Sequence, residues 1–263
     1  MQVNTTSGVR RQCDDDLRLA QRFSIPAHIH VCVTGDGSVV LDVQRDKYLG
    51  LGREETEILA DSVSGWPQPL WPRRLSLEKA AVLRATRQIC EPLVEDGVLE
   101  RIAEGQLARV MVTLKDMRGE WISIGDEMEI RGRLSLRHTW NFVAAYMWAR
   151  WSLGLRPFSA VVEAIEAGKR DAVRMGAAWH PNVVAELVDV FRQLRPLVFA
   201  AEGRCLLHAV TLMRFLCRYG LGPEWVIGVA TQPWGAHSWV QWGNFLLDSN
   251  PEKVCAFTPI MVV

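Results

Sequence analysis

The period of the apolar pattern changes twice along this chain of 263 residues, and those changes determine the fold class. From residue 28 to residue 43 apolar and polar residues alternate, which predicts extended strands with one buried face. The turn residues Thr34-Gly35-Asp36-Gly37 interrupt this alternation, so the segment is predicted to be a β-hairpin. A third short strand is expected over residues 47–51.

Three short helical stretches are predicted to follow these strands before residue 105. One runs from about Glu54 to Val63 and another begins at Ser76. Leu93, Val94, Val98 and Leu99 close this block, with Gly97 as a natural break. Strands followed by short helices are typical of a compact winged-helix-type unit, which we place at residues 1–105. Residues 106–135 mix charged residues, glycine and short apolar pieces, and are predicted to be a linker or entry segment.

Beyond residue 135 the apolar residues recur at helical spacings of three and four. Helices are predicted over residues 134–153, from Pro157, from Pro181 and over 204–219. Strand candidates follow at residues 225–231, 236–242 and 244–248. Residues 136–263 are therefore predicted to form a helical block followed by a small antiparallel sheet, and the fold class of the whole chain is α+β.

Charge and targeting signals narrow the class of protein. Thirty Lys and Arg residues balance thirty Asp and Glu residues, whereas a general nucleic-acid binder normally carries a basic excess. The N-terminus has no apolar run typical of a signal peptide. The segment Phe142–Leu155 contains Arg150 and is too short to cross a bilayer. We therefore expect a cytoplasmic protein with no nucleic-acid and no membrane partner.

Neither a metal nor a cofactor is expected. The six cysteines are scattered without a C-x-x-C pair, which favours reduced thiols over a zinc ribbon. His28, His30 and Cys32 share one strand face as metal ligands could, but no fourth ligand is apparent. The chain has no P-loop and no G-x-G-x-x-G motif, so direct use of a nucleotide has no support.

Three residues near the C-terminus carry candidate chemistry. Cys205 falls in the first turn of a predicted helix, where unpaired backbone N–H groups stabilise a thiolate, and Arg204 adds a positive charge. His237 lies on a predicted strand and can act as base and then as acid. Asp248 lies on the next predicted strand and can orient the His237 ring. This order of residues and elements is similar to that of papain and the transglutaminases.

Several segments resemble the leader peptidases of lasso-peptide biosynthesis. They are Cys205-Leu206, VIGV at 226–229, AHSWV at 236–240 and FTPI at 257–260. That family has a transglutaminase-like cysteine protease domain, in many members fused to a winged-helix domain that recognises the leader. The resemblance implies cleavage of a precursor peptide, so that an asparagine-synthetase-like partner cyclase can close the macrolactam. It also implies Cys205 as nucleophile, His237 as general base and Asp248 as orienting acid.

Other residues compete for two of these roles. His208 stands where the family often has Arg, and it is a rival base one helical turn from Cys205. Ser249 and Asn250 are lesser rivals to Asp248.

The N-terminal unit is predicted to bind the leader. A short third strand with an open edge can pair with an extended peptide, and a following helix can form the groove wall. The candidates are Tyr48 and Leu49 on the strand, and Leu83, Arg84 and Arg87 on the helix. The arginines would suit acidic positions of a leader.

Two other functions stay open at this point. A winged helix could bind DNA or a peptide beside a degenerate protease domain, which would make the chain a regulator or scaffold. The same triad could also transfer the acyl group to an amine instead of water.

Overall fold

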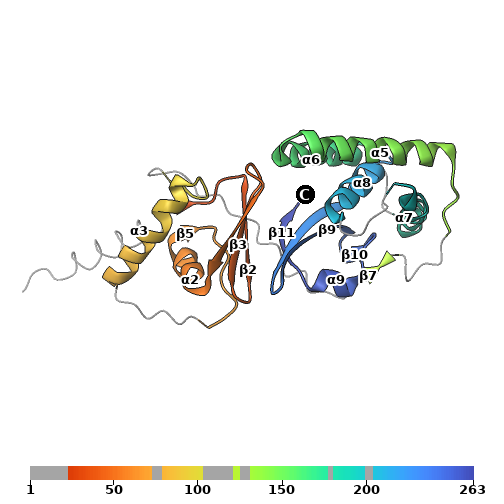
Figure 1. The fold of residues 1–263 in the computed structure, drawn as a ribbon. Helices are drawn as coiled ribbons and strands as arrows, with labels where there is room; N and C mark the ends of the chain where they lie inside the picture. Colours follow the sequence, from red (N-terminus) through yellow and green to blue (C-terminus); the bar gives the residue numbers. More distant parts are fainter. Residues whose placement is uncertain (1–22, 73–78, 103–120, 125–130, 177–179, 199–203) are drawn as a thin grey trace, which may run out of the picture. The chain divides into compact units, whose positions relative to one another are not determined.

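The computed structural model describes residues 23–72, 79–102, 121–124, 131–176, 180–198 and 204–263. The chain divides near residues 113 and 114 into two compact units, and each is described by itself (Figure 1). Most of the predicted linker at 106–135 lies outside the described residues.

The N-terminal unit contains the predicted three-stranded antiparallel sheet. Its strands are β2 (Ile29–Thr34), β3 (Gly37–Asp42) and β4 (Lys47–Gly52), in the order β2-β3-β4. Thr34 pairs with Gly37 at the tight turn, so the expected hairpin is confirmed. A Cβ atom on Gly37 would lie 2.0 Å from the Leu51 carbonyl oxygen on the neighbouring strand β4. This close approach explains why glycine stands at the start of β3.

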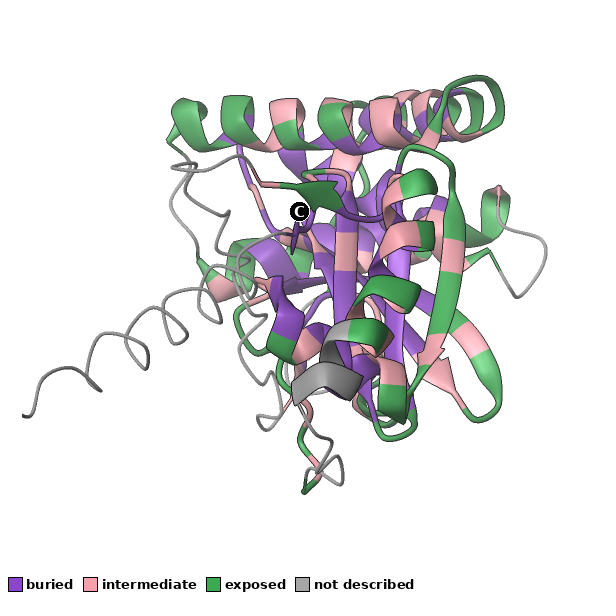
Figure 2. Cartoon of the chain, turned by 90° about the vertical axis from the view of Figure 1, so that its left-hand side faces the viewer, coloured by how far each residue is buried: buried purple, intermediate pink, exposed green. Residues whose placement is uncertain are grey.

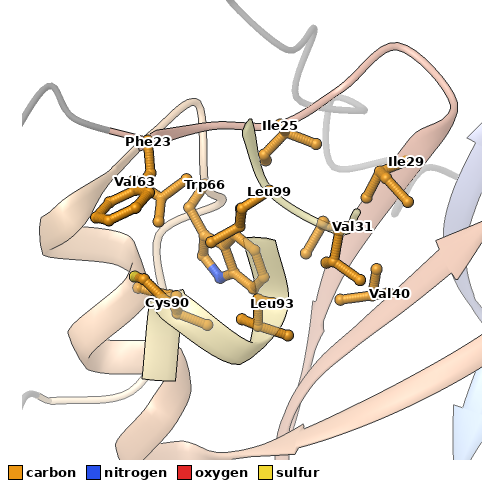
Figure 3. Packing of buried hydrophobic residues seen from close by; sticks show 12 residues of the cluster. Phe23, Ile25, Ile29, Val31, Val40, Val63, Trp66, Cys90, Leu93 and Leu99 are labelled. Atoms are coloured by element: carbon orange, nitrogen blue, oxygen red, sulfur yellow. The ribbon is translucent and has the colours of Figure 1, made fainter. Parts of the chain in front are cut away.

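Helices and a second small sheet cover the rest of this unit. The helices are α2 (Arg53–Ser62) and α3 (Lys79–Glu95). The strands β1 (Phe23–Ser24), β5 (Val63–Ser64) and β6 (Glu100–Arg101) pair in the order β5-β1-β6. Their buried side chains pack around Trp66 and Cys90, as Figure 3 shows, and join the small sheet to α3.

Two of the three predicted helices of the N-terminal unit are seen in its described residues. They are α2 and α3, and α3 continues through Pro92 to Glu95. The second sheet was not predicted, since strands of two residues are too short to show a period of two.

The C-terminal unit has the predicted helical block followed by a small, largely antiparallel sheet. The helices are α5 (Leu136–Leu155), α6 (Phe158–Met175), α7 (Pro181–Leu194), the short η1 (Arg195–Leu197), α8 (Cys205–Cys217) and α9 (Pro251–Cys255). The strands are β7 (Ile122–Ser123), β8 (Glu224–Thr231), β9 (Trp234–Trp242), β10 (Phe245–Leu246) and β11 (Thr258–Val262), in the order β11-β8-β9-β10-β7. Among the described strands of this unit, only β7 and β10 pair in parallel. Residues 122 and 123, assigned to the linker from the sequence, therefore belong to this sheet.

Local sequence signals explain where the helices begin and end. The Ser135 side chain accepts a hydrogen bond from the His138 backbone N–H and caps α5. Pro181 occupies the first position of α7, where its missing N–H costs nothing. Gly176 ends α6 in the left-handed conformation with φ of 70°.

Helix α8 occupies the centre of the C-terminal unit. It packs against α5 and α6 and against strands β8 and β9. The rings of Phe142, Phe191 and Phe215 meet edge-on or tilted, with centroids 5.3–6.4 Å apart, and join α5 and α7 to α8. Figure 2 shows the buried residues gathered on the inner helices and strands, with exposed residues on the outer turns.

Candidate active site

Cys205 is the first residue of α8, as the sequence predicts. Its neighbour Arg204 occupies the N-cap position, and the Arg204 carbonyl accepts the backbone N–H of His208. The first N–H groups of a helix have no partner within the helix, so they stabilise negative charge at that end. The Cys205 thiol is free and half-buried. The site therefore suits a thiolate nucleophile.

Three other described cysteines are much poorer nucleophiles. Burial raises the pKa of the Cys32 and Cys90 thiols to about 12. Burial also raises the pKa of Cys217, at the far end of α8, to about 11. Cys255 is exposed but lies near the end of the short helix α9, away from any helix N-terminus. Cys13 lies outside the described residues.

His237 is buried on β9 among aromatic rings. Its ring stacks on Trp239 at 6.0 Å between centroids and packs against Phe257 at 5.2 Å. The indole of Trp239 donates a hydrogen bond to the Gln241 side chain, which holds its orientation. A Cβ atom on Gly228, the partner of His237 on β8, would lie 2.8 Å from the Trp239 ring. The glycine thus leaves space for the aromatic support of His237.

The surroundings of His237 favour the neutral imidazole. Burial, followed by the charges of Lys253 and His208, lowers the pKa of His237 from 6.5 to about 4. The buried Nε2 atom has no hydrogen-bond partner among the described residues. The ring is thus in the neutral form that a general base requires, and its low pKa makes it a weaker base than a free imidazole.

The low pKa of His237 predicts a pH dependence of stability. Between pH 6.5 and about 4 the folded state binds fewer protons at this ring than the unfolded state, so stability falls as the pH falls. The stabilisation is complete above pH 6.5 and is lost near pH 4, a change of ~3 kcal/mol. Urea unfolding of wild type and His237→Gln across this range measures it. The unfolding free energy of the variant should fall less steeply between pH 6.5 and about 4 than that of wild type. An equally steep fall in both proteins would contradict the prediction.

Asp248 is surrounded by basic side chains from the helical block. Its Oδ1 atom accepts from Arg192 Nε at 2.9 Å, and its Oδ2 atom lies 2.8 Å from His208 Nε2 and 3.5 Å from Arg195 Nη1. Burial alone would raise the pKa of Asp248, but His208 and Arg192 outweigh it and hold the pKa below its usual value. The carboxylate is therefore charged at neutral pH.

The predicted pairing of Asp248 with His237 is not formed. The sequence placed Asp248 on a strand over 244–248, but β10 ends at Leu246. Leu247 still donates to the Val240 carbonyl at 3.0 Å, and the carboxylate of the next residue, Asp248, reaches α7, η1 and α8. His208, considered from the sequence as a rival base, is the histidine that Asp248 contacts.

Arg192 and Arg195 were missed from the sequence. Arg192 and Asp248 are 56 residues apart, and no local pattern links an arginine on one helix to an acid after a distant strand. Of the two lesser rivals, Asn250 caps α9 by accepting the Glu252 backbone N–H at 2.8 Å. Ser249 is half-buried beside it.

The predicted leader-binding residues lie on two elements of the N-terminal unit. Strand β4 is at one edge of its sheet, with Leu49 38% exposed and Tyr48 half-buried. Arg84 and Arg87 are exposed and three residues apart on α3, so they share one helix face. The side chain of Leu83 lies outside the described part.

The described residues show neither a metal cluster nor a membrane-spanning helix. No group of three or more His, Cys, Asp or Glu residues in them could hold a metal ion, and this covers the His28, His30 and Cys32 motif. Among the described helices, none combines the length and the apolar character needed to cross a membrane.

The comparison with known families agrees with the fold of the C-terminal unit. No curated protein and no solved structure matches the chain. Residues 141–262 match the model of the transglutaminase-like superfamily, and this range includes Cys205, His237 and Asp248. Residues 141–262 are thus a transglutaminase-like superfamily domain.

Proposed function

We propose that this protein is a cysteine endopeptidase that removes the leader from the precursor of a lasso peptide. One observation carries the proposal. Cys205 begins helix α8 inside a transglutaminase-like domain, and α8 packs against the strand that bears His237. That superfamily generally includes cysteine proteases, and the segments quoted from the sequence resemble leader peptidases.

The proposed reaction uses Cys205 and His237 in two steps. The Cys205 thiolate attacks the scissile carbonyl carbon, and the Cys205 backbone N–H can donate to the oxyanion. His237 takes the thiol proton and then gives it to the leaving amine as the C–N bond breaks. Water, deprotonated by His237, hydrolyses the thioester and releases the leader with a free carboxylate. The freed core amine is then the substrate of the proposed asparagine-synthetase-like cyclase.

The edge strand β4 supports recognition of the leader by strand addition. β4 pairs with β3 on one side, and β4 is the end strand of that sheet. An extended peptide can pair with such an edge through backbone hydrogen bonds, while Tyr48 and Leu49 contact alternate side chains. Arg84 and Arg87 on α3 are proposed to meet acidic positions of the leader. Leu83 is proposed as a further contact.

Incubation with the small peptide encoded beside the gene tests the proposed activity. Mass spectrometry is expected to detect leader and core with one water added in total, and preincubation with iodoacetamide should stop their release. An added amine attached to the leader would assign acyl transfer in place of hydrolysis. Tight binding with no thiol-dependent product would instead assign a non-catalytic scaffold.

A further inference from the structure

Helix α5 exposes a continuous line of large apolar side chains. Starting at Leu136, they follow at intervals of four, three, four, four and four residues, which places them on one helix face. The exposed fractions are 92% for Leu136, 70% for Trp140, 41% for Val143, 37% for Met147, 61% for Trp151 and 83% for Leu155. We call these six side chains the α5 stripe. The outer face of a globular helix is normally polar, so the stripe indicates a surface that binds.

Folding of the C-terminal unit does not account for the α5 stripe. The opposite side of α5 buries Phe142, Ala145 and Ala149 against the core, with Asn141 and Ser152 beside them. Figure 1 shows α5 along the border of this unit, with α8 between it and the sheet. The helix is thus apolar on both sides, and its inner side already provides the packing that the fold needs.

The charged side chains of residues 131–156, which include α5, all have one sign. Residues 131–156 contain five arginines and no Asp or Glu. All five, at positions 131, 133, 137, 150 and 156, are exposed. Arg137 and Arg150 are on α5 itself, and the others flank its ends. A partner that covers the stripe must therefore bring negative charge to both ends and to the helix itself.

This charge pattern disfavours a second copy of the chain. In a two-fold pair of antiparallel α5 helices, the arginines of each copy would meet a stretch that has no acid to receive them. The repulsion would be greatest where the apolar side chains exclude water.

An anionic lipid surface offers acyl chains to the α5 stripe and negative charge to the arginines beside it. Trp is favoured at the membrane interface, where its ring contacts acyl chains and its N–H stays hydrated. Arg side chains beside an apolar helix face reach the phosphate groups of anionic lipids. We propose that α5 lies flat on an anionic membrane surface, with the α5 stripe inserted at the headgroup boundary. This differs from crossing the bilayer, which the sequence analysis considered when it expected no membrane partner.

Vesicle binding by the full-length protein tests the proposal independently of peptidase activity. Co-sedimentation is expected with vesicles of phosphatidylcholine and phosphatidylglycerol at 3:1, and much less with phosphatidylcholine alone. The double variant Trp140→Gln/Trp151→Gln should lower the partition coefficient at least tenfold. Arg137→Gln and Arg150→Gln should each lower it about fivefold. Met175→Gln, which replaces an exposed apolar residue at the end of α6, is the matched control and should bind like wild type.

Three outcomes would overturn the membrane proposal. The first is equal binding by wild type and the tryptophan double variant, both shown to be folded by circular dichroism. The second is no binding of wild type to the anionic vesicles. The third is a wild-type dimer in light scattering that Trp140→Gln/Trp151→Gln converts to a monomer, which would assign the stripe to a second copy.

Discussion

Cys205→Ala is expected to lower the rate of precursor cleavage at least ~10³-fold while the affinity for the leader is retained. The substitution removes the Sγ nucleophile at the first turn of α8, where the helix stabilises the thiolate. Leader binding should persist because the proposed leader contacts are on β4 and α3, in the other unit. Initial rates by mass spectrometry and leader affinity by fluorescence anisotropy measure the two effects.

Cys255→Ala is the matched control for Cys205→Ala. Cys255 is free and exposed like a reactive thiol, yet it lies on α9. Cys255→Ala should leave the cleavage rate unchanged. This result would show that losing an exposed thiol elsewhere does not lower the rate, and that the effect of Cys205→Ala is specific to its position. Cleavage at the wild-type rate by Cys205→Ala would exclude Cys205 as the nucleophile.

Asp248→Ala is expected to destabilise the protein by about 2–3 kcal/mol near pH 7. The substitution leaves Arg192 and His208 without the carboxylate that they contact at 2.9 and 2.8 Å. We place the cost below that of a fully buried pair because the Arg192 side chain is 30% exposed and can be rehydrated.

The effect of Asp248 should depend on pH in one direction. Because the folded-state pKa of Asp248 lies below the usual value, its contribution is complete above about pH 4 and is lost as the pH falls through the folded-state pKa. Urea unfolding at pH 7 and at pH 3 measures the difference between wild type and variant. A difference that stays constant over this range would contradict the charged state assigned to Asp248.

A double-mutant cycle tests whether Asp248 is energetically coupled to His208 or to His237. The structure predicts strong coupling in stability and in cleavage rate between Asp248→Asn and His208→Gln, because these side chains are in contact. The matched cycle with His237→Gln should be nearly additive in stability. Strong coupling of Asp248 with His237 in the cleavage rate alone would assign the carboxylate to the His237 ring during the reaction.

The elements with a clear period were predictable from the sequence, as was the position of Cys205. Strands β2 and β3 alternate regularly around a Gly-containing turn, and α8 shows its start through the polar residues before Cys205 and its end through Gly220. The environment of Asp248 was not predictable. Whether a chain leaves a strand at residue 246 or 248 depends on tertiary packing, and the position of Asp248 depends on that difference.

The burial of most of α8 has a consequence for how the proposed active site is lost on heating. Residues 209–217 of this helix are buried between the other helices and the sheet, with the exception of the half-buried Arg214. Their amide hydrogens should exchange with solvent through global opening of the C-terminal unit rather than through local fraying. Cys205, the proposed nucleophile, thus begins the helix that is expected to exchange most slowly in its unit. Thermal inactivation should follow the unfolding of that unit as a whole, with no earlier loss confined to the catalytic thiol.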